Sequence, residues 1–180
     1  ANRNFHLNYY AVLGLKARIC LYAKNVTLAY SAANEVILAQ QQKGLFPWVK
    51  TADITTTEAN LRDRTFSSEH LFAFNTTKLE EYIKGYFREA SIPLMERLMP
   101  GELYEADDYR TALYETYSGF ANVLTKFWQM DKAYVQGQGY VTPKRNRMPG
   151  IRIAEMYYIA AEALKESSIE DALEMLNTLR

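Results

Sequence analysis

The sequence has a single cysteine, no long apolar run and no excess of charge of one sign, and each absence excludes a class of protein. Cys20 is the only cysteine among 180 residues, which excludes an internal disulfide framework and any metal site built from several thiolates. No run of about eighteen apolar residues occurs, so the sequence predicts no membrane-spanning helix. The 21 basic residues balance the 21 acidic ones, which argues against nucleic acid or an anionic membrane as the main partner.

Motifs for catalysis and metal binding are also missing. His6 and His70 are the only histidines, and neither has a second imidazole or a thiolate near it in the sequence. There is no glycine-rich phosphate loop, nucleophile elbow or His-Glu-x-x-His pattern. The sequence therefore predicts no catalytic residues, no cofactor and no metal.

One acidic cluster has the residue type that glycoside hydrolysis needs, because that reaction uses two carboxylates on either side of the scissile bond. The cluster consists of Glu102, Glu105, Asp107 and Asp108. Acids grouped in a loop bordered by proline and glycine are more typical of a solvated surface. The short basic run from Lys144 to Arg147 has no interleaved aromatic residues, so we interpret it as a solvated loop too.

Small and apolar residues at helical spacing predict a helical hairpin near the start of the chain, from Asn8 to Gln41 with a break near Lys24-Asn25. Alanines in the second half would let the two helices approach closely. The inward positions expected are Tyr10, Leu13, Ala17, Cys20 and Leu21 in the first helix and Leu28, Ala29, Ala32, Ala33, Val36 and Ile37 in the second.

A second hairpin is predicted at the other end, after Pro149-Gly150. Ser167-Ser168 interrupts the pattern, and Ser168 is placed to cap a helix that begins near Ile169. The inward positions expected are Ile153, Met156, Tyr157, Ala160, Ala161 and Leu164, followed by Ala172, Leu173, Leu176 and Leu179.

The two hairpins share a spacing, because 12 residues separate Ala17 from Ala29 and also Ala160 from Ala172. Small residues at facing positions are typical of tetratricopeptide-like repeats. We therefore predict a mostly α-helical fold, in which residues 1–43 and 151–180 are helical-repeat hairpins of one domain and residues 44–150 are a large irregular insertion.

Within the insertion we expect short strands and loops. The strands are expected at 68–74 and 124–128, and short helices or loops at 79–87 and 94–98. Glycine and proline make 136–139 and 142–150 irregular in this interpretation.

Two motifs resemble a known family. The helix Tyr9 to Tyr22, with its Leu-Lys-Ala-Arg core, is similar to a repeat helix of the SusD/RagB family. The segment Arg152-Ile-Ala-Glu155 leading to Ala-Glu-Ala, followed by Leu176-Asn177 and Arg180, resembles a late repeat of the same family. Arg152 and Glu155 lie at the start of their helix, where they can pair with each other or with neighbouring turns, and we assign them a structural role.

The resemblance implies a non-catalytic, SusD-like outer-membrane lipoprotein that binds nutrient glycan. It also implies a surface location at the outer membrane, membrane attachment only through a lipid anchor outside this chain, and a SusC-type TonB-dependent transporter as partner. Members of the family are several hundred residues long, so the chain is expected to be a fragment of such a protein.

Aromatic residues in irregular segments are the candidates for a sugar-binding surface, because aromatic faces stack on the apolar faces of sugar rings. Those chosen are Trp48, Trp128, Tyr134 and Tyr140. The predicted function is oligosaccharide capture and delivery to the transporter. The alternative is a helical-repeat adaptor that binds a peptide or a protein in its groove.

Overall fold

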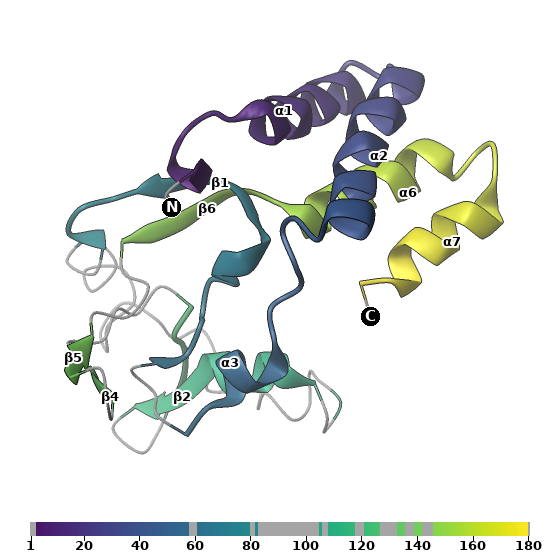
Figure 1. Ribbon diagram of the computed structural model, residues 1–180. Coiled ribbons are helices and arrows are strands. Elements are labelled where there is room, and N and C mark those ends of the chain that lie inside the picture. Colours follow the sequence, from purple (N-terminus) through teal and green to yellow (C-terminus); the bar gives the residue numbers. More distant parts are fainter. Residues whose placement is uncertain are drawn as a thin grey trace. The chain divides into compact units, whose positions relative to one another are not determined.

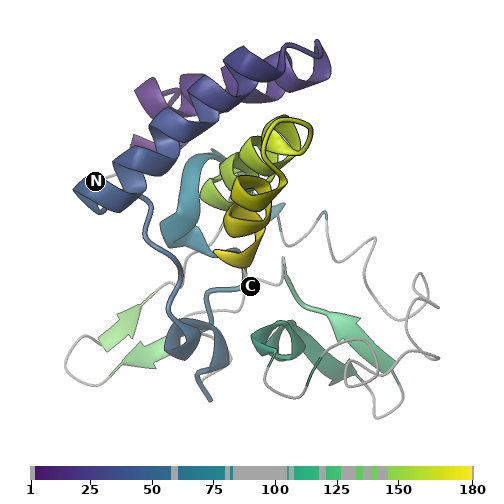
Figure 2. The same cartoon turned by 90° about the vertical axis from the view of Figure 1, so that its right-hand side faces the viewer.

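A computed structural model of the chain describes residues 3–57, 61–79, 82, 105, 108–117, 121–126, 133–135, 139–141 and 146–179 (Figures 1 and 2). The chain divides into two compact units. One, here called the helical unit, comprises Ala1–Trp48, Ser68–Phe74 and Pro149–Arg180, and the second unit comprises Val49–Ser67 and Asn75–Met148.

The helical unit begins with the 3-10 turn η1 (Arg3–Phe5) and the hairpin of α1 (Tyr9–Tyr22) and α2 (Val26–Lys43). The Asn8 side chain starts α1 by accepting hydrogen bonds from the backbone N–H groups of Tyr10 and Ala11, at 3.0 and 3.1 Å. Asn25 starts α2 in the same way, with Leu28 as donor at 3.1 Å. The predicted hairpin and its break at Lys24-Asn25 are confirmed.

The second hairpin consists of α6 (Ile153–Leu164) and α7 (Ile169–Asn177). Ser168 caps α7 as predicted, since its side chain accepts from the N–H of Asp171 at 3.5 Å. In sequence order α1 packs on α2, α2 on α6 and α6 on α7. The predicted mostly helical fold with two repeat-like hairpins is thereby confirmed.

Alanines set the spacing of this layer, because a methyl side chain lets helix backbones approach closely. Ala17, Ala29, Ala33 and Ala160 are completely buried. Larger apolar side chains fill the remaining volume of the same core, namely Leu13, Val36, Ile37, Leu71, Ile151, Ile153, Met156 and Tyr157. The predicted inward stripe of α6 is buried except for Leu164, which is half-buried. On α1, Leu13 and Ala17 belong to the core, and Tyr10, Cys20 and Leu21 pack against it.

Three leucines do not lie where the stripe predicted. Leu28, Leu173 and Leu176 are exposed, so their predicted inward positions are wrong. On α7 the buried residue is Ala172, and Met175 and Leu179 are partly buried against the core. Helical spacing alone does not decide which of several neighbouring apolar positions are buried, because that depends on where the adjacent helix packs.

A two-stranded ribbon is formed by β1 (His70–Asn75) and β6 (Arg147–Arg152), with the 3-10 turn η3 (Ser67–Glu69) before β1. Residues 70–74 and 149–152 of the ribbon belong to the helical unit. The strand predicted at 68–74 is confirmed. The prediction that 142–150 is irregular is wrong from residue 147 onward, because β1 needs a backbone partner and β6 supplies it. A Cβ at Gly150 would lie 2.8 Å from the ring of Phe72, so glycine permits this close approach.

The second unit contains α3 (Thr51–Thr55), the 3-10 helix η4 (Tyr109–Leu113), and two antiparallel pairs, β2 (Tyr114–Tyr117) with β3 (Ala121–Leu124) and β4 (Ala133–Val135) with β5 (Gly139–Val141). Among the residues that the structure describes in this unit, Ile54, Phe66 and Leu113 form a buried apolar cluster. Of the strand predicted at 124–128, Leu124 is the last residue of β3 (Ala121–Leu124), Thr125 and Lys126 are not in a strand, and residues 127–128 lie outside the described residues.

The predicted helices or loops at 79–87 and 94–98 lie almost entirely outside the described residues. Among the helices of the described residues, none is long and apolar enough to span a membrane.

Candidate functional site

Trp48 lies at the end of a short segment that leaves α2 and is fixed to the helical core. Gly44 ends α2 in the left-handed conformation, with φ of 64°. The side chain of Gln40 then donates to the carbonyl of Phe46 at 3.0 Å, and the ring of Phe46 meets that of Tyr10 edge-on at 5.5 Å. The backbone that leads to Trp48 is therefore held at Phe46 by two independent contacts.

The indole of Trp48 rests against Tyr157 of α6, with ring centroids 5.4 Å apart and a tilt of 44°. Its residue is 37% exposed, whereas Tyr157 is 2% exposed. Trp48 thus combines a supported ring with access to solvent. This combination is what a stacking surface for a sugar ring requires.

Tyr157 is itself fixed by a buried polar contact. Its hydroxyl donates to Oε1 of Gln40 at 2.8 Å, and burial raises the pKa of Tyr157 above its ordinary value. Gln40 uses its amide oxygen for Tyr157 and its amide nitrogen for the carbonyl of Phe46. One glutamine therefore joins α2, α6 and the segment that carries Trp48.

Tyr134 and Tyr140 occupy one position of the β4–β5 pair. The backbone register places Tyr134 directly opposite Tyr140, between the pairs Ala133 with Val141 and Val135 with Gly139. Of the four predicted site residues, the structure brings these two together within the second unit. Trp48 belongs to the helical unit, and Trp128 lies outside the described residues.

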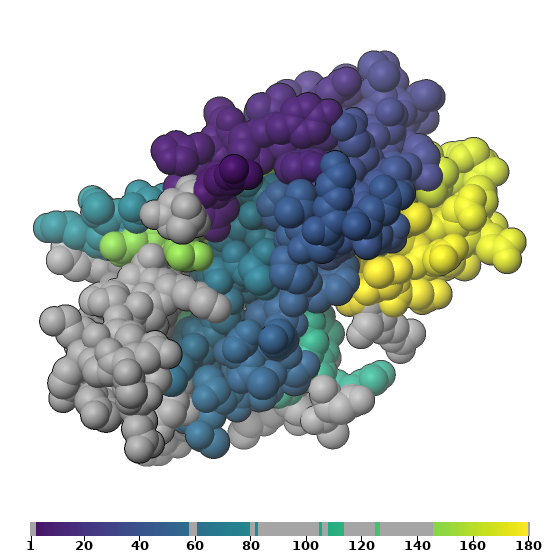
Figure 3. All heavy atoms as spheres, in the orientation of Figure 1, coloured from purple at the N-terminus to yellow at the C-terminus, as the bar shows by residue number. Residues whose placement is uncertain are grey.

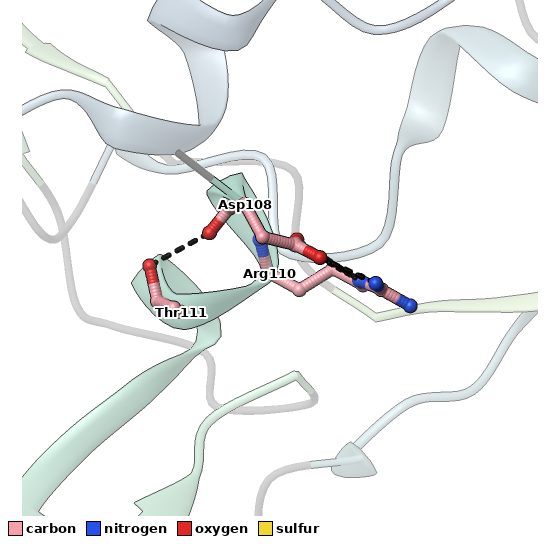
Figure 4. A network of polar contacts seen from close by, with 3 residues as sticks. All are labelled: Asp108, Arg110 and Thr111. Carbon is pink, nitrogen blue, oxygen red and sulfur yellow. Dashed lines mark hydrogen bonds and ion pairs between the residues drawn. The ribbon is translucent and has the colours of Figure 1, made fainter. Parts of the chain in front are cut away.

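In the predicted acidic cluster, Asp108 forms hydrogen bonds with two residues that follow it closely in the sequence, Arg110 and Thr111 (Figure 4). Arg110 donates to Asp108 through its backbone N–H at 2.8 Å and through its guanidinium, and Thr111 donates its hydroxyl to the carbonyl of Asp108 at 2.8 Å. The guanidinium lowers the pKa of Asp108. A general acid in glycoside hydrolysis needs a raised pKa, so Asp108 is unsuited to that role.

The remaining polar candidates do not form a metal site among the residues that the structure describes. Glu105 is exposed, His6 is exposed after η1, and His70 is buried at the first position of β1. Glu102, Asp107, Lys144 and Arg145 lie outside the described residues, and Arg147 opens β6.

Arg152 and Glu155 each pair with a distant segment of the helical unit. Arg152 donates to Glu69 at 2.9 Å. Glu155 receives two hydrogen bonds from Arg18 of α1, at 2.6 and 2.7 Å, and Arg18 also donates to the carbonyl of Gly150 at 2.8 Å. The assigned structural role agrees with this geometry, because the two ion pairs fix the start of α6 to α1 and to the turn before β1.

Gln40 was missed at the level of sequence, although a signal for it exists. It follows Val36 by four residues and Ile37 by three, so it lies on the buried stripe of α2. A polar residue on an apolar stripe needs a partner. Phe46 and Tyr157 are those partners, and neither pairing can be predicted from a single sequence.

Comparison with known proteins gives a result at the level of three-dimensional structure. No protein-family model matches the sequence, and no curated protein matches it. A SusD superfamily protein from Bacteroides thetaiotaomicron VPI-5482 matches 97% of this chain with 26% identity and a TM-score of 0.64.

Two structures from Bacteroides vulgatus ATCC 8482 match as well. One is a SusD superfamily protein, matched over 99% of this chain with 20% identity and a TM-score of 0.63. The other is described as a SusD-like carbohydrate binding protein, matched over 99% with 20% identity and a TM-score of 0.58. The chain spans 40% of the first vulgatus protein, 41% of the thetaiotaomicron protein and 38% of the second vulgatus protein.

These matches agree with the resemblance carried by the Leu-Lys-Ala-Arg and Arg-x-x-Glu motifs. Arg18 of the first motif and Glu155 of the second form an ion pair in the structure. The predicted resemblance is confirmed: this chain is similar to SusD superfamily proteins and has their fold over almost its whole length.

Proposed function

We propose that this chain is part of a SusD-like surface protein that binds oligosaccharide without chemical turnover. The observation that carries the proposal is the shared fold, since one of the matching structures is described as a carbohydrate binding protein. The supported, solvent-accessible ring of Trp48 supplies a surface of the kind that such binding needs.

Stacking on an aromatic ring suits carbohydrate because sugar rings present apolar C–H faces. Trp48 is held by Tyr157 on one side and by the fixed segment from Gly44. A ring that is already ordered loses little conformational freedom when a ligand binds, which favours affinity.

Three further aromatic residues of the predicted insertion, residues 44–150, are proposed as ligand contacts in their own right: Trp128, Tyr134 and Tyr140. Tyr134 and Tyr140 share one position of the β4–β5 pair, and Trp128 is the second tryptophan of the chain. Hydroxyl and amide groups near such rings would meet the sugar hydroxyls.

The role that follows is capture and not hydrolysis. Asp108 is committed to Arg110 and has a lowered pKa, which leaves it poorly suited to protonate a glycosidic oxygen. We further propose that the whole protein lies at the cell surface, attached to the outer membrane through a lipid anchor, and passes glycan to a SusC-type TonB-dependent transporter.

Calorimetric titration of the chain with a panel of oligosaccharides tests the proposal. At least one sugar should bind, and Trp48→Ala should weaken its binding about tenfold or more, in the range found for truncation of aromatic contact residues. Tyr22→Ala is the matched control, because Tyr22 is an exposed aromatic residue far along α1 from the Trp48 segment.

The titration also separates binding from turnover. Chromatography of the sugars after overnight incubation should show them unchanged. Absence of binding across the panel, or binding that Trp48→Ala leaves intact together with Trp128→Ala and the double variant of Tyr134 and Tyr140, would contradict the proposed site.

A further inference from the structure

Phe46, two residues before Trp48, has a backbone conformation that bulky residues rarely adopt. Its φ is 52°, which lies in the left-handed region. A residue with a large side chain stays in this region only where its surroundings hold it there, and such residues are concentrated at functional sites. Gly44 is also left-handed, with φ of 64°, but glycine adopts this conformation without strain. Of the two residues, Phe46 is the strained one.

One side chain of α2 holds this strained backbone in place. Nε2 of Gln40 donates a hydrogen bond to the carbonyl oxygen of Phe46 at 3.0 Å, and Gln40 is buried. A hydrogen bond away from water is stronger than the same bond on the surface. The bond therefore opposes relaxation of Phe46 to an ordinary negative φ.

The other end of the same amide holds the ring on which Trp48 rests. Oε1 of Gln40 accepts a hydrogen bond from the hydroxyl of Tyr157 at 2.8 Å. Because a backbone carbonyl can only accept, the amide nitrogen must face Phe46 and the amide oxygen must face Tyr157. A side chain at this position therefore needs both a donor and an acceptor at its end, which an amide supplies.

The place of α2 in the helical layer makes this double contact possible. The helix packs on α1 and on α6, and in Figure 3 the blue spheres of α2 lie between the purple spheres of α1 and the yellow spheres of the C-terminal hairpin. A side chain near the end of α2 can therefore reach both α6 and the segment that follows α2.

We propose that Gln40 is a positioning residue for carbohydrate binding. Its two hydrogen bonds fix the backbone that leads to Trp48 and the ring that supports the indole, so the indole is ordered before a sugar arrives. Gln40 is buried, so it acts on the sugar through Trp48. The inference rests on the proposed function of Trp48 as a stacking surface. It adds that affinity depends on an amide behind that surface.

Two substitutions of Gln40 test this role. In Gln40→Glu the ionised carboxylate can accept from Tyr157 but cannot donate to Phe46, and in Gln40→Met the side chain has no donor. Calorimetry at pH 8 uses cellohexaose, maltohexaose, xylohexaose and mannohexaose. Each variant should bind the tightest of these sugars about three- to tenfold more weakly than the native chain, as expected when a side chain must become ordered on binding. Gln42→Glu, exposed on the same helix, is the matched control and should bind as the native chain does.

The pH dependence gives a readout that a purely structural role would not produce. As the pH is lowered from about 8 to about 5, the buried carboxyl of Gln40→Glu takes up a proton, because burial raises its pKa. The protonated carboxyl can again donate to Phe46. The ratio of native to variant affinity should therefore fall towards one for Gln40→Glu and stay constant for Gln40→Met. Circular dichroism should show both variants folded at each pH, so that the ratio reports the binding site.

The mobility of the Trp48 indole is measured without any sugar. The heteronuclear nuclear Overhauser effect of its N–H should be that of an ordered group in the native chain and lower in Gln40→Met, because the backbone and the supporting ring are then less restrained. If none of the four sugars binds, carbohydrate binding by this chain fails, and this measurement still decides whether Gln40 positions Trp48.

Two results would overturn the inference while the proposed function stands. The first is that Trp48→Ala weakens sugar binding whereas both variants of Gln40 bind as the native chain does. The second is an indole of Trp48 that is as ordered in Gln40→Met as in the native chain. If Gln40→Glu does not fold, Gln40→Met decides the question through both affinity and mobility.

Discussion

Arg18 of α1 and Glu155 of α6 form a two-pronged ion pair, with Nε to Oε1 at 2.6 Å and an Nη to Oε2 at 2.7 Å. The residues are 137 positions apart in the sequence, and each belongs to one of the two motifs that resemble the SusD family. Their side chains are 36 and 30% exposed. The pairing explains why an arginine suits this position of the first motif better than a lysine, because the planar guanidinium donates two parallel hydrogen bonds from two different nitrogens.

Glu155→Gln should lower the free energy of unfolding by about 1 kcal/mol, because a partly exposed ion pair contributes modestly even when it is two-pronged. Arg18→Lys should have a similar effect. Urea unfolding measures both, with Glu166→Gln in the exposed turn after α6 as a control that should leave stability unchanged. Equal stability of Glu155→Gln and the native chain would contradict a stabilising role for the pair.

Tyr157→Phe should destabilise the helical unit by about 1–2 kcal/mol, because it leaves Oε1 of the buried Gln40 without its donor. The neighbouring Tyr158 is 57% exposed, so Tyr158→Phe is a matched control with the same chemical change. Thermal unfolding followed by circular dichroism compares the two. A larger loss for Tyr158→Phe would show that the Gln40 contact has been misjudged.

Gly44→Ala should cost about 1 kcal/mol, because Gly44 ends α2 with a positive φ that alanine tolerates poorly. No atom lies within 4 Å of the position that a Cβ would occupy, so the cost is one of backbone conformation and not of crowding. Gly44→Asn should lose less, since asparagine accepts the left-handed conformation more readily. A higher free energy of unfolding for Gly44→Ala than for Gly44→Asn, measured by denaturant unfolding, would contradict this explanation.

Asp108 should make the free energy of unfolding fall when the pH is lowered into the acid range. Arg110 lowers the folded-state pKa of Asp108 below its ordinary value, so its contribution is present above the unfolded-state pKa and disappears as pH falls through the folded-state pKa. Asp108→Asn should therefore be less stable than the native chain at pH 7, and the difference should shrink below about pH 4. Unfolding curves measured from pH 7 to pH 2 give this difference directly. A difference that stays constant over the whole range would contradict a role for the ionised carboxylate.

The helical ends of the fold could be predicted from the sequence because their signals are local. Asn25 and Ser168 cap helices through their own neighbours, and buried alanines recur at helical spacing. The pairing of β1 with β6 could not be predicted, because the two strands are far apart in the sequence and neither segment contains a signal that specifies its partner. The misplacement of Leu173 and Leu176 has the same origin, since their exposure depends on what packs against α7.

The candidate site was predictable only in part. The sequence predicts Trp48 as a ligand contact because it lies in or beside an irregular segment, and the structure gives it a supporting ring and access to solvent. Its support by Gln40 and Tyr157 arises from contacts between α2 and α6, which depend on the tertiary fold. Tyr134 and Tyr140 are opposite each other through strand register, a relationship that their separate positions in the sequence did not reveal.

The most direct test of the proposed carbohydrate site is a nuclear magnetic resonance titration of the indole N–H signals. The chain has two tryptophans, so two such signals are expected, and Trp48→Phe assigns them. On addition of an oligosaccharide that binds, the signal of Trp48 should move progressively and reach saturation at the concentration found by calorimetry. A sugar that binds to saturation while the Trp48 signal stays fixed would contradict the assignment of Trp48, and a panel in which no sugar moves either signal would contradict carbohydrate binding by this chain.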